Sequence, residues 1–188
     1  MPEPIQLKKS GGLGRISQCY LDDMQYICSV KGYSLYMEVC EPSVYMDDDA
    51  DSDVYICLVD MSKPSYKKIV SQVWLSHVKN GYYTIDMVQV SKHYSGQGIS
   101  YAMYKAILKN TTIKLVCGDI QSPGGRYIWR KLIQSKAVSV KAGAIKKHSR
   151  KYDVKLSGKT DVYAVTKNWL IDIYSDDYSD YRLFAEVL

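Results

Sequence analysis

The segment from Val88 to Asn110 constrains the fold more than any other part of this sequence. The residues Tyr82–Val90 are rich in aromatic and β-branched side chains, which is typical of a β-strand. A short polar stretch with two glycines, Gly96 and Gly98, follows. The apolar residues after it recur at helical spacing: Ile99, Ala102, Met103, Ala106 and Ile107. The segment is therefore predicted to be a strand, a glycine turn and a helix.

A glycine turn at the start of a helix favours the binding of an anion. The first amides of a helix have no intrahelical partner, and the helix dipole adds positive charge at the same end. Gly96 and Gly98 lack the β-carbons that would keep a phosphate away from the backbone. The alternative is a tight turn with no ligand, which is common between strands and helices.

The motif resembles the coenzyme A-binding motif of the GNAT superfamily of N-acetyltransferases. In that family a strand ending in alternating aliphatic residues precedes an aromatic residue, a glycine turn and a helix. Two positions depart from the pattern, because Ser95 replaces an arginine or glutamine and Ser100 replaces a glycine or alanine. The matching residues are Val88, Val90, Tyr94, Gly96, Gly98 and Ile99.

The resemblance implies acyl-CoA as the bound ligand, with acetyl-CoA as the expected cofactor. The backbone of Val88, Gln89 and Val90 is then expected to hold the pantetheine arm. The diphosphate is expected at the turn. The residues assigned to that part of the site are Ser95, Gly96, Gln97, Gly98, Ile99 and Ser100.

The catalytic residues are predicted less directly. Asp86 lies two residues before Val88, so the period of a strand places both on one face, where family members often have a base. Trp129 stands where the family often has a tyrosine acid. Tyr127, two residues away, is kept as a candidate, although helical spacing turns it to another side of the helix. Ser122 stands where an asparagine is frequent. The alternative for Asp86 is a solvent-facing or lysine-paired carboxylate.

The rest of the sequence predicts an α+β fold with a mixed, mostly antiparallel sheet flanked by helices, in the order of elements of a GNAT-like domain. We expect one domain over residues 1–188, with a core at about 54–166 and a C-terminal extension at 167–188. A helix is predicted from Gly14 to about Val30. Another is expected at Arg126–Ser135. The predicted strands besides Tyr82–Val90 are Ser34–Cys40, Val54–Met61, Ile69–Val78, Ile113–Cys117, Ala137–Ile145 and Asp161–Thr166, with the last two paired as a hairpin.

Composition excludes several classes of protein. Hydrophobic residues make up 46% of the 188 residues, which argues against a disordered chain. No apolar run approaches the length of a membrane span and no secretory signal is recognisable, so a cytoplasmic protein without membrane contact is expected. The five scattered cysteines lack a CxxC pair, which indicates reduced thiols and no metal site. An aspartate-rich stretch, Met46–Asp53, is predicted to be a solvated loop, with a calcium loop as the alternative.

Two further functions are compatible with this sequence. The basic run Lys146, Lys147, Arg150 and Lys151 would suit nucleic acid phosphates, as in phage Mom-type DNA modification proteins, or would be a solvated loop. A non-catalytic GNAT-like protein, possibly a viral one that binds a host partner, is the other alternative. The serine at Ser95 and the tryptophan at Trp129 favour it. The first prediction remains an acyl-CoA-dependent N-acyltransferase with an unknown acceptor amine.

Overall fold

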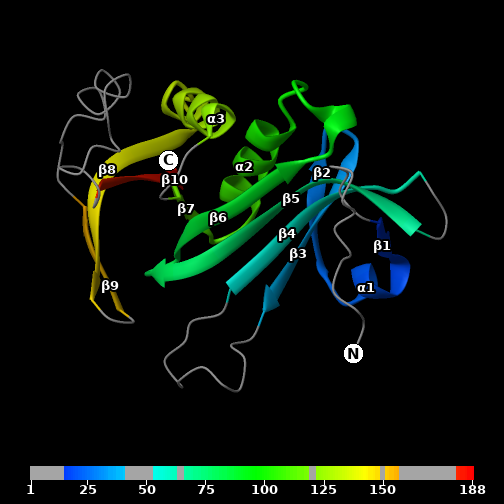
Figure 1. Ribbon diagram of the computed structural model, residues 1–188, viewed down its shortest axis with the longest axis horizontal. Coiled ribbons are helices and arrows are strands. Elements are labelled where there is room, and N and C mark those ends of the chain that lie inside the picture. The colour runs from blue at the N-terminus through cyan, green and yellow to red at the C-terminus, as the bar shows by residue number, and fades with distance from the viewer. Residues whose placement is uncertain (1–14, 41–52, 63–65, 119–121, 149–150, 157–180) are drawn as a thin grey trace. The chain divides into compact units, whose positions relative to one another are not determined.

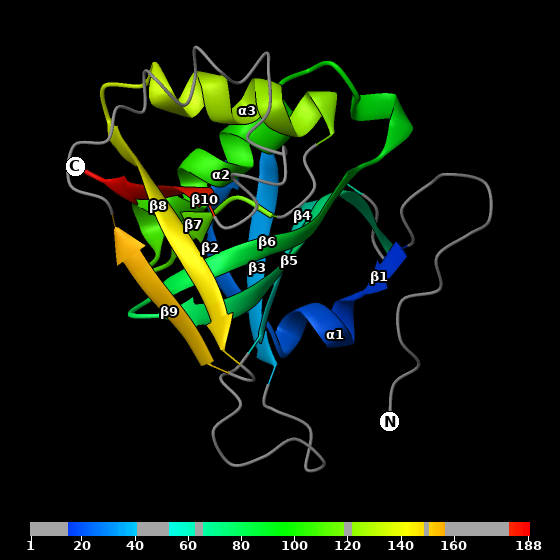
Figure 2. The same ribbon diagram turned by 60° about the vertical axis from the view of Figure 1, so that its left-hand side comes forward.

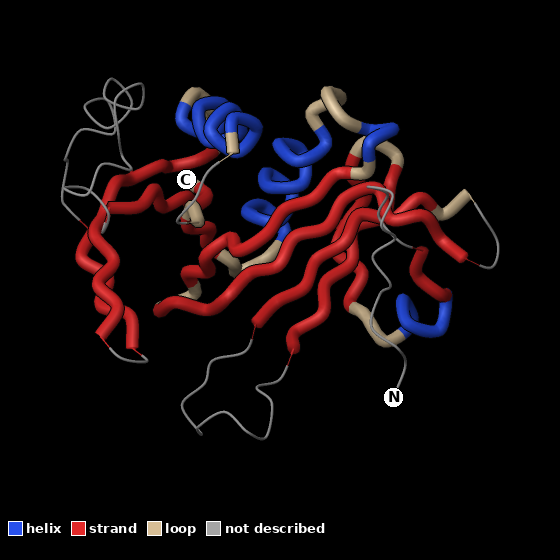
Figure 3. Tube along the Cα trace, in the orientation of Figure 1, coloured by secondary structure: helices blue, strands red, loops and turns tan. Residues whose placement is uncertain are grey.

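Strands make up most of the described chain, and the helices are few (Figure 3). The computed structural model describes residues 15–40, 53–62, 66–118, 122–148, 151–156 and 181–188. All paired strands in these ranges are antiparallel except one parallel pair. The predicted α+β class with a mostly antiparallel sheet is therefore confirmed.

The chain divides into two compact units, and two long strands contribute residues to both. The first unit comprises residues up to Leu75 and Met87–Thr111. The second comprises Ser76–Asp86 and residues from Thr112 onward. The helices and strands of the first unit are labelled in Figure 1: β1 (Arg15–Ser17), α1 (Gln18–Asp22), β2 (Gln25–Val30), β3 (Tyr33–Cys40), β4 (Asp53–Asp60), most of β5 (Tyr66–Lys79), the end of β6 (Tyr82–Val90) and α2 (Ile99–Asn110). The 3-10 helix η1 (Lys92–Tyr94) lies between β6 and α2 in the sequence.

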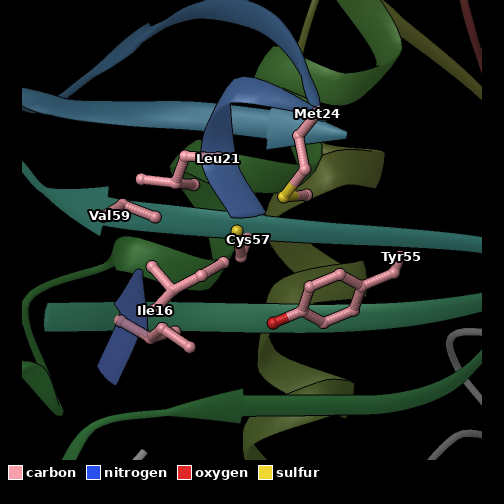
Figure 4. Packing of buried hydrophobic residues seen from close by; sticks show 7 residues of the cluster. Ile16, Leu21, Met24, Tyr55, Cys57 and Val59 are labelled. Atoms are coloured by element: carbon pink, nitrogen blue, oxygen red, sulfur yellow. The ribbon is translucent and has the colours of Figure 1, made fainter. Parts of the chain in front are cut away.

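The first unit is a sheet with a helix on each face. β2, β3, β4 and β5 pair in sequence order, and β1 pairs with the start of β5. β4 is buried along nearly its whole length, as expected for a central strand. Its alternate residues Tyr55, Cys57 and Val59 form a core cluster with Leu21 of α1 (Figure 4). The full cluster is Ile16, Leu21, Met24, Tyr55, Cys57, Val59 and Ile69.

The opposite face of this sheet carries α2. Cys28 of β2 is paired with Leu35, which is paired with Leu58, so these three side chains share the face away from Cys57. The amide of Asn110, at the end of α2, donates to the sulfur of Cys28 at 3.6 Å. The apolar side of α2 is buried over this face through Ile99, Met103, Tyr104, Ile107 and Leu108.

The predicted helix from Gly14 to Val30 is wrong for most of its length. Only Gln18–Asp22 is helical, and the residues on both sides form β1 and β2. Ile16 and Met24, two of the apolar residues in this range, belong with Leu21 to one buried cluster that is built from a strand, a short helix and a turn. Strand pairing with β3 and β5 therefore overrides the local helical pattern.

The second unit is a smaller sheet with one helix packed on β8 (Figure 2). β6 runs parallel to β7, with Tyr82–Thr84 beside Lys114–Val116. The last strand, β10, lies antiparallel between β7 and β8, and its Phe184 packs on Tyr82 with ring centroids 5.3 Å apart. The elements are the end of β5, the start of β6, β7 (Lys114–Val116), α3 (Pro123–Ile133), β8 (Val138–His148), β9 (Lys151–Leu156) and β10 (Tyr181–Val187).

Two predictions about the end of the chain need correction. The basic run was expected to be a loop, but Lys146 and Lys147 continue β8, and Lys151 begins β9. The partner of β8 in the hairpin is β9, not a strand at 161–166, and residues 161–166 lie outside the described ranges, as does Arg150. Part of the predicted C-terminal extension forms β10.

The strands that lead to the glycine turn follow the predictions closely. β3, β4, β5 and β6 occupy the predicted ranges to within three residues, and the turn before β6 holds Asn80 and Gly81 at positive φ, as a two-residue hairpin requires. All five cysteines are free thiols, as predicted. In the ranges that the structure describes, no helix is long and apolar enough to cross a membrane.

Candidate functional site

The end of β6 has backbone groups that face away from its neighbour β5. The amide of Ser91 donates to Val70 O at 2.9 Å, and the hydroxyl of Ser71 donates to Gln89 O at 2.9 Å. Backbone groups alternate in direction along an antiparallel strand, so those of Val88 and Val90 point to the other side. Among the described residues, the parallel ladder with β7 covers only Tyr82–Thr84. Val88 and Val90 therefore lie on a stretch of edge beyond that ladder.

The turn after β6 is built by its own backbone bonds. η1 follows β6, and the amides of Tyr94, Ser95 and Gln97 donate to carbonyls three residues earlier. Gly96 and Gly98 have φ of +77° and +69°, a conformation that residues with a β-carbon rarely adopt. A β-carbon added at Gly96 would meet nothing within 4 Å. The space over this part of the turn is thus open among the described residues.

α2 begins without a side-chain cap. Its N-cap is Gly98, which has no side chain to accept a hydrogen bond, and Ala102 N→Gly98 O at 3.1 Å is the first helical bond. The amides of Ile99, Ser100 and Tyr101 precede this bond and therefore have no intrahelical acceptor. Together with the helix dipole they form a region of positive potential beside exposed glycines. Of the residues predicted for the diphosphate, Ser95 and Gln97 use their amides within the turn.

A lysine that the sequence analysis missed lies against the turn. Lys31 is in the tight turn between β2 and β3, at φ +52°, and its Nζ donates to Gln97 O at 2.7 Å. It is 66 residues from Gln97 in the sequence, so no local pattern indicates the contact. Lys31 brings a positive charge to the turn, where the motif has Ser95 in place of a cationic or amide side chain.

An aromatic pair connects η1, at the start of the turn, to β3. The rings of Tyr33 and Tyr94 pack edge to face with centroids 5.4 Å apart, and the amine of Lys68 lies 5.0 Å from the centroid of Tyr94. Tyr94 is the aromatic position of the predicted motif, and here it anchors η1 to β3 and β5. Its position indicates a structural role in setting the path of the turn.

The predicted catalytic side chains all lie in the second unit. Asp86 is exposed and accepts a short hydrogen bond from the hydroxyl of Ser76. Ser122 accepts from the amide of Gly125 at 3.2 Å and so caps α3. Tyr127 is 57% exposed, with the amine of Lys131 at 5.6 Å from its ring centroid. Trp129 is fully buried and belongs to the core.

The site defined by the geometry is therefore smaller than the predicted one. Its clear parts are the edge of β6 at Val88 and Val90, the exposed glycines, the first amides of α2 and the amine of Lys31. Asp86, Ser122 and Tyr127 stay predictions as catalytic groups. No family model, curated protein or solved structure matches this chain, so the resemblance to the GNAT superfamily depends on the motif and the order of elements alone.

Proposed function

We propose that this protein is an acyl-CoA-dependent N-acyltransferase that binds acetyl-CoA along β6 and at the glycine turn. The observation that carries the proposal is the continuity of two features. The strand edge at Val88 and Val90 leads directly into the uncapped N-terminus of α2. An elongated ligand with amide groups at one end and a diphosphate at the other could hydrogen-bond to the strand edge through its amides and to the start of α2 through its diphosphate.

Each part of the ligand has a matching group in the protein. The pantetheine arm carries amides, which pair with the amides and carbonyls of a strand edge as an added strand would. The diphosphate suits the amides at the start of α2, because anions are stabilised at a helix N-terminus. Lys31 adds a positive charge at the same point, and its Nζ lies 2.7 Å from Gln97 O. Its amine would exchange this carbonyl for a phosphate oxygen.

The chemical step needs a neutral amine and a leaving thiolate. Asp86 is the proposed base, since it lies on the same strand as the cofactor edge. Ser122 is committed to capping α3, and Trp129 is buried where the family motif has its tyrosine. We therefore propose that the thiolate leaves without a side-chain acid at either position.

Calorimetric titration with acetyl-CoA tests the proposal. The wild-type chain should bind it, and Gly96→Val should abolish binding because a branched side chain fills the open space and disfavours positive φ. Lys31→Met should weaken binding about tenfold through loss of a charge-assisted contact. Lys109→Met, in the last turn of α2, removes the same charge far along the helix and should have little effect.

Two results would contradict the proposal. One is the absence of acetyl-CoA binding to a folded wild-type chain at millimolar concentration. The other is an equal loss of affinity in the two lysine variants, which would indicate a response to net charge and not to the turn. Circular dichroism of each variant establishes that the fold is retained.

A further inference from the structure

Positive charge is concentrated in one part of the sequence. Residues 87–152 contain 13 of the 25 lysines and arginines but only one of the 20 acidic residues, Asp119. The rest of the chain has 12 basic and 19 acidic residues, so the net charge of +5 conceals a strongly basic segment beside acidic ones. Such asymmetry is typical of chains that bind a polyanion, either a nucleic acid or an anionic membrane.

α3 lies within this segment and presents its positive charge on one side. The apolar side of the helix is buried through Ile128, Trp129 and Leu132, and α3 contains no acidic residue. The opposite side has four large exposed side chains, which we call the basic face of α3: Arg126, Tyr127, Arg130 and Lys131. Side chains four residues apart are neighbours on a helix, so the two arginines form one row and the tyrosine and lysine form the next.

Other cations of the second unit differ in how far they are available to a partner. Lys141 and Lys114 both contact the carboxylate of Glu186, at 2.5 Å and 3.6 Å, so their charge is neutralised locally. Lys136 is exposed three residues beyond the end of α3 and adds a positive charge close to the basic face in the sequence. The surface that we consider is therefore centred on α3 and not on the sheet.

Tyr127 adds an exposed aromatic ring to these cations. The amine of Lys131 lies 5.6 Å from the centroid of this ring. Proteins bind single-stranded nucleic acids through the same combination, because bases stack on aromatic rings while cations contact the phosphates. The planar guanidinium of an arginine can form two hydrogen bonds to one phosphate, and the flexible stem of a lysine lets its amine turn toward another.

We infer that the basic face of α3 binds a single-stranded nucleic acid, with phosphates at its three cations and one base on the ring of Tyr127. The inference does not depend on the proposed acyltransferase function, because α3 belongs to the second unit and acetyl-CoA is proposed to bind to elements of the first. A membrane fits less well, since a helix that lies on a bilayer inserts its apolar side, which α3 buries within the protein. A duplex keeps its bases stacked, so it offers none to the tyrosine.

Fluorescence anisotropy of the full-length chain with a labelled single-stranded oligonucleotide of about 16 nucleotides tests the inference. The wild-type chain should bind it, with an affinity that falls as the salt concentration rises. Arg130→Gln should weaken binding about fivefold and reduce the slope of log affinity against log salt by about 0.7, as expected for one lost phosphate contact. The matched control is Lys79→Gln, which removes an exposed lysine at the end of β5, outside the basic segment, and should change the affinity by less than about twofold.

Substitution of Tyr127 tests the stacked base without a change in charge. Tyr127→Leu should weaken binding about fivefold, because the base loses its aromatic partner, whereas Tyr127→Phe should retain most of the affinity. The slope against salt should be the same in both variants as in the wild type, since no phosphate contact is lost. Circular dichroism establishes that each variant keeps its fold.

Several outcomes would overturn the inference. One is the absence of oligonucleotide binding to a folded wild-type chain at low salt, and another is an equal loss in Arg130→Gln and Lys79→Gln, which would indicate a response to net charge alone. Unchanged binding in Tyr127→Leu would contradict the stacked base. Tighter binding of a duplex of equal length, of phosphatidylserine vesicles or of polyglutamate would overturn the assignment to a single-stranded nucleic acid.

Discussion

Two glycine-containing turns each lead into a helix, but only one of these helices has a side-chain cap at its N-terminus. In the first unit, Gly96 and Gly98 both have positive φ, and the helix begins at a residue that cannot cap it. In the second unit, the turn Ser122–Gly125 places Pro123 in the first helical position, and Ser122 accepts from the amide of Gly125. Gly124 is an ordinary helical residue. The first amides of α2 have no side-chain cap, whereas Ser122 caps one amide of α3.

Two glutamates, one in each unit, also differ in the partners that surround them. Each accepts a hydrogen bond from a tyrosine hydroxyl, Glu38 from Tyr20 at 2.6 Å and Glu186 from Tyr82 at 3.3 Å. Glu186 also contacts Lys141 at 2.5 Å and Lys114 at 3.6 Å, so its charge is neutralised within the second unit. Glu38 has no such cation among the described residues. Among the described residues, the two glutamates thus share a tyrosine donor but differ in their ion pairs.

Alanine at one glycine of each turn gives the largest expected contrast. Gly98→Ala should destabilise the protein by about 1–2 kcal/mol, because a β-carbon is strained at φ +69°. Gly124→Ala should stabilise it by about 0.5–1 kcal/mol, since the helix already has a suitable conformation and the new carbon meets only Ser122 Oγ at 3.8 Å. Urea unfolding followed by circular dichroism measures both. Effects of the same sign would show that the two turns are equivalent.

Removal of a serine from each turn tests the capping difference. Ser122→Ala should cost about 1 kcal/mol, because the amide of Gly125 loses its acceptor. Ser95→Ala should change the free energy of unfolding by less than about 0.5 kcal/mol, since its side chain is exposed and caps no helix. The same urea titration serves for both. A cost at Ser95 as large as at Ser122 would contradict the assignment of an uncapped first turn.

Sequence patterns predicted the parts of the fold that local physical chemistry determines. The aromatic and β-branched run Tyr82–Val90 and the helical spacing after Gly98 each depend on neighbours in the chain, and both predicted elements are confirmed. β10 was missed because its mixture of aromatic and charged residues has no period. Its place is set by pairing with β7 and β8. The same reason explains the wrong helix at 14–30, where tertiary pairing overrides local spacing.

The candidate site also combines residues that a local sequence motif predicts with a residue that only the tertiary fold brings there. The glycines and the strand before them are a local motif, so the sequence predicted them. Lys31 comes from the turn between β2 and β3, 66 residues before Gln97, and only the tertiary fold brings its amine to the glycine turn.

Acid unfolding gives the smallest expected contrast, and it depends on Glu186. The hydrogen bond from Lys141 holds the pKa of Glu186 below its ordinary value of 4.5, although burial opposes this shift. A carboxylate with a lowered folded-state pKa stabilises the protein above its unfolded-state pKa. This stability is lost as the pH falls through the lower, folded-state value. Because the lysines are 40% and 48% exposed, the contribution is less than about 1 kcal/mol.

Glu186→Gln should therefore lower the free energy of unfolding at pH 7 slightly and remove part of its decrease between about pH 5 and pH 3. Glu38→Gln should have a smaller effect at pH 7, because no lysine or arginine of the described residues loses an ion pair. Urea titrations at pH 7 and pH 3.5 measure the two variants beside the wild type. A larger loss at pH 7 from Glu38→Gln than from Glu186→Gln would contradict the assignment of the stronger charge interactions to Glu186, and would mean that the charge of Glu38 contributes more to stability than its contact with Tyr20 indicates.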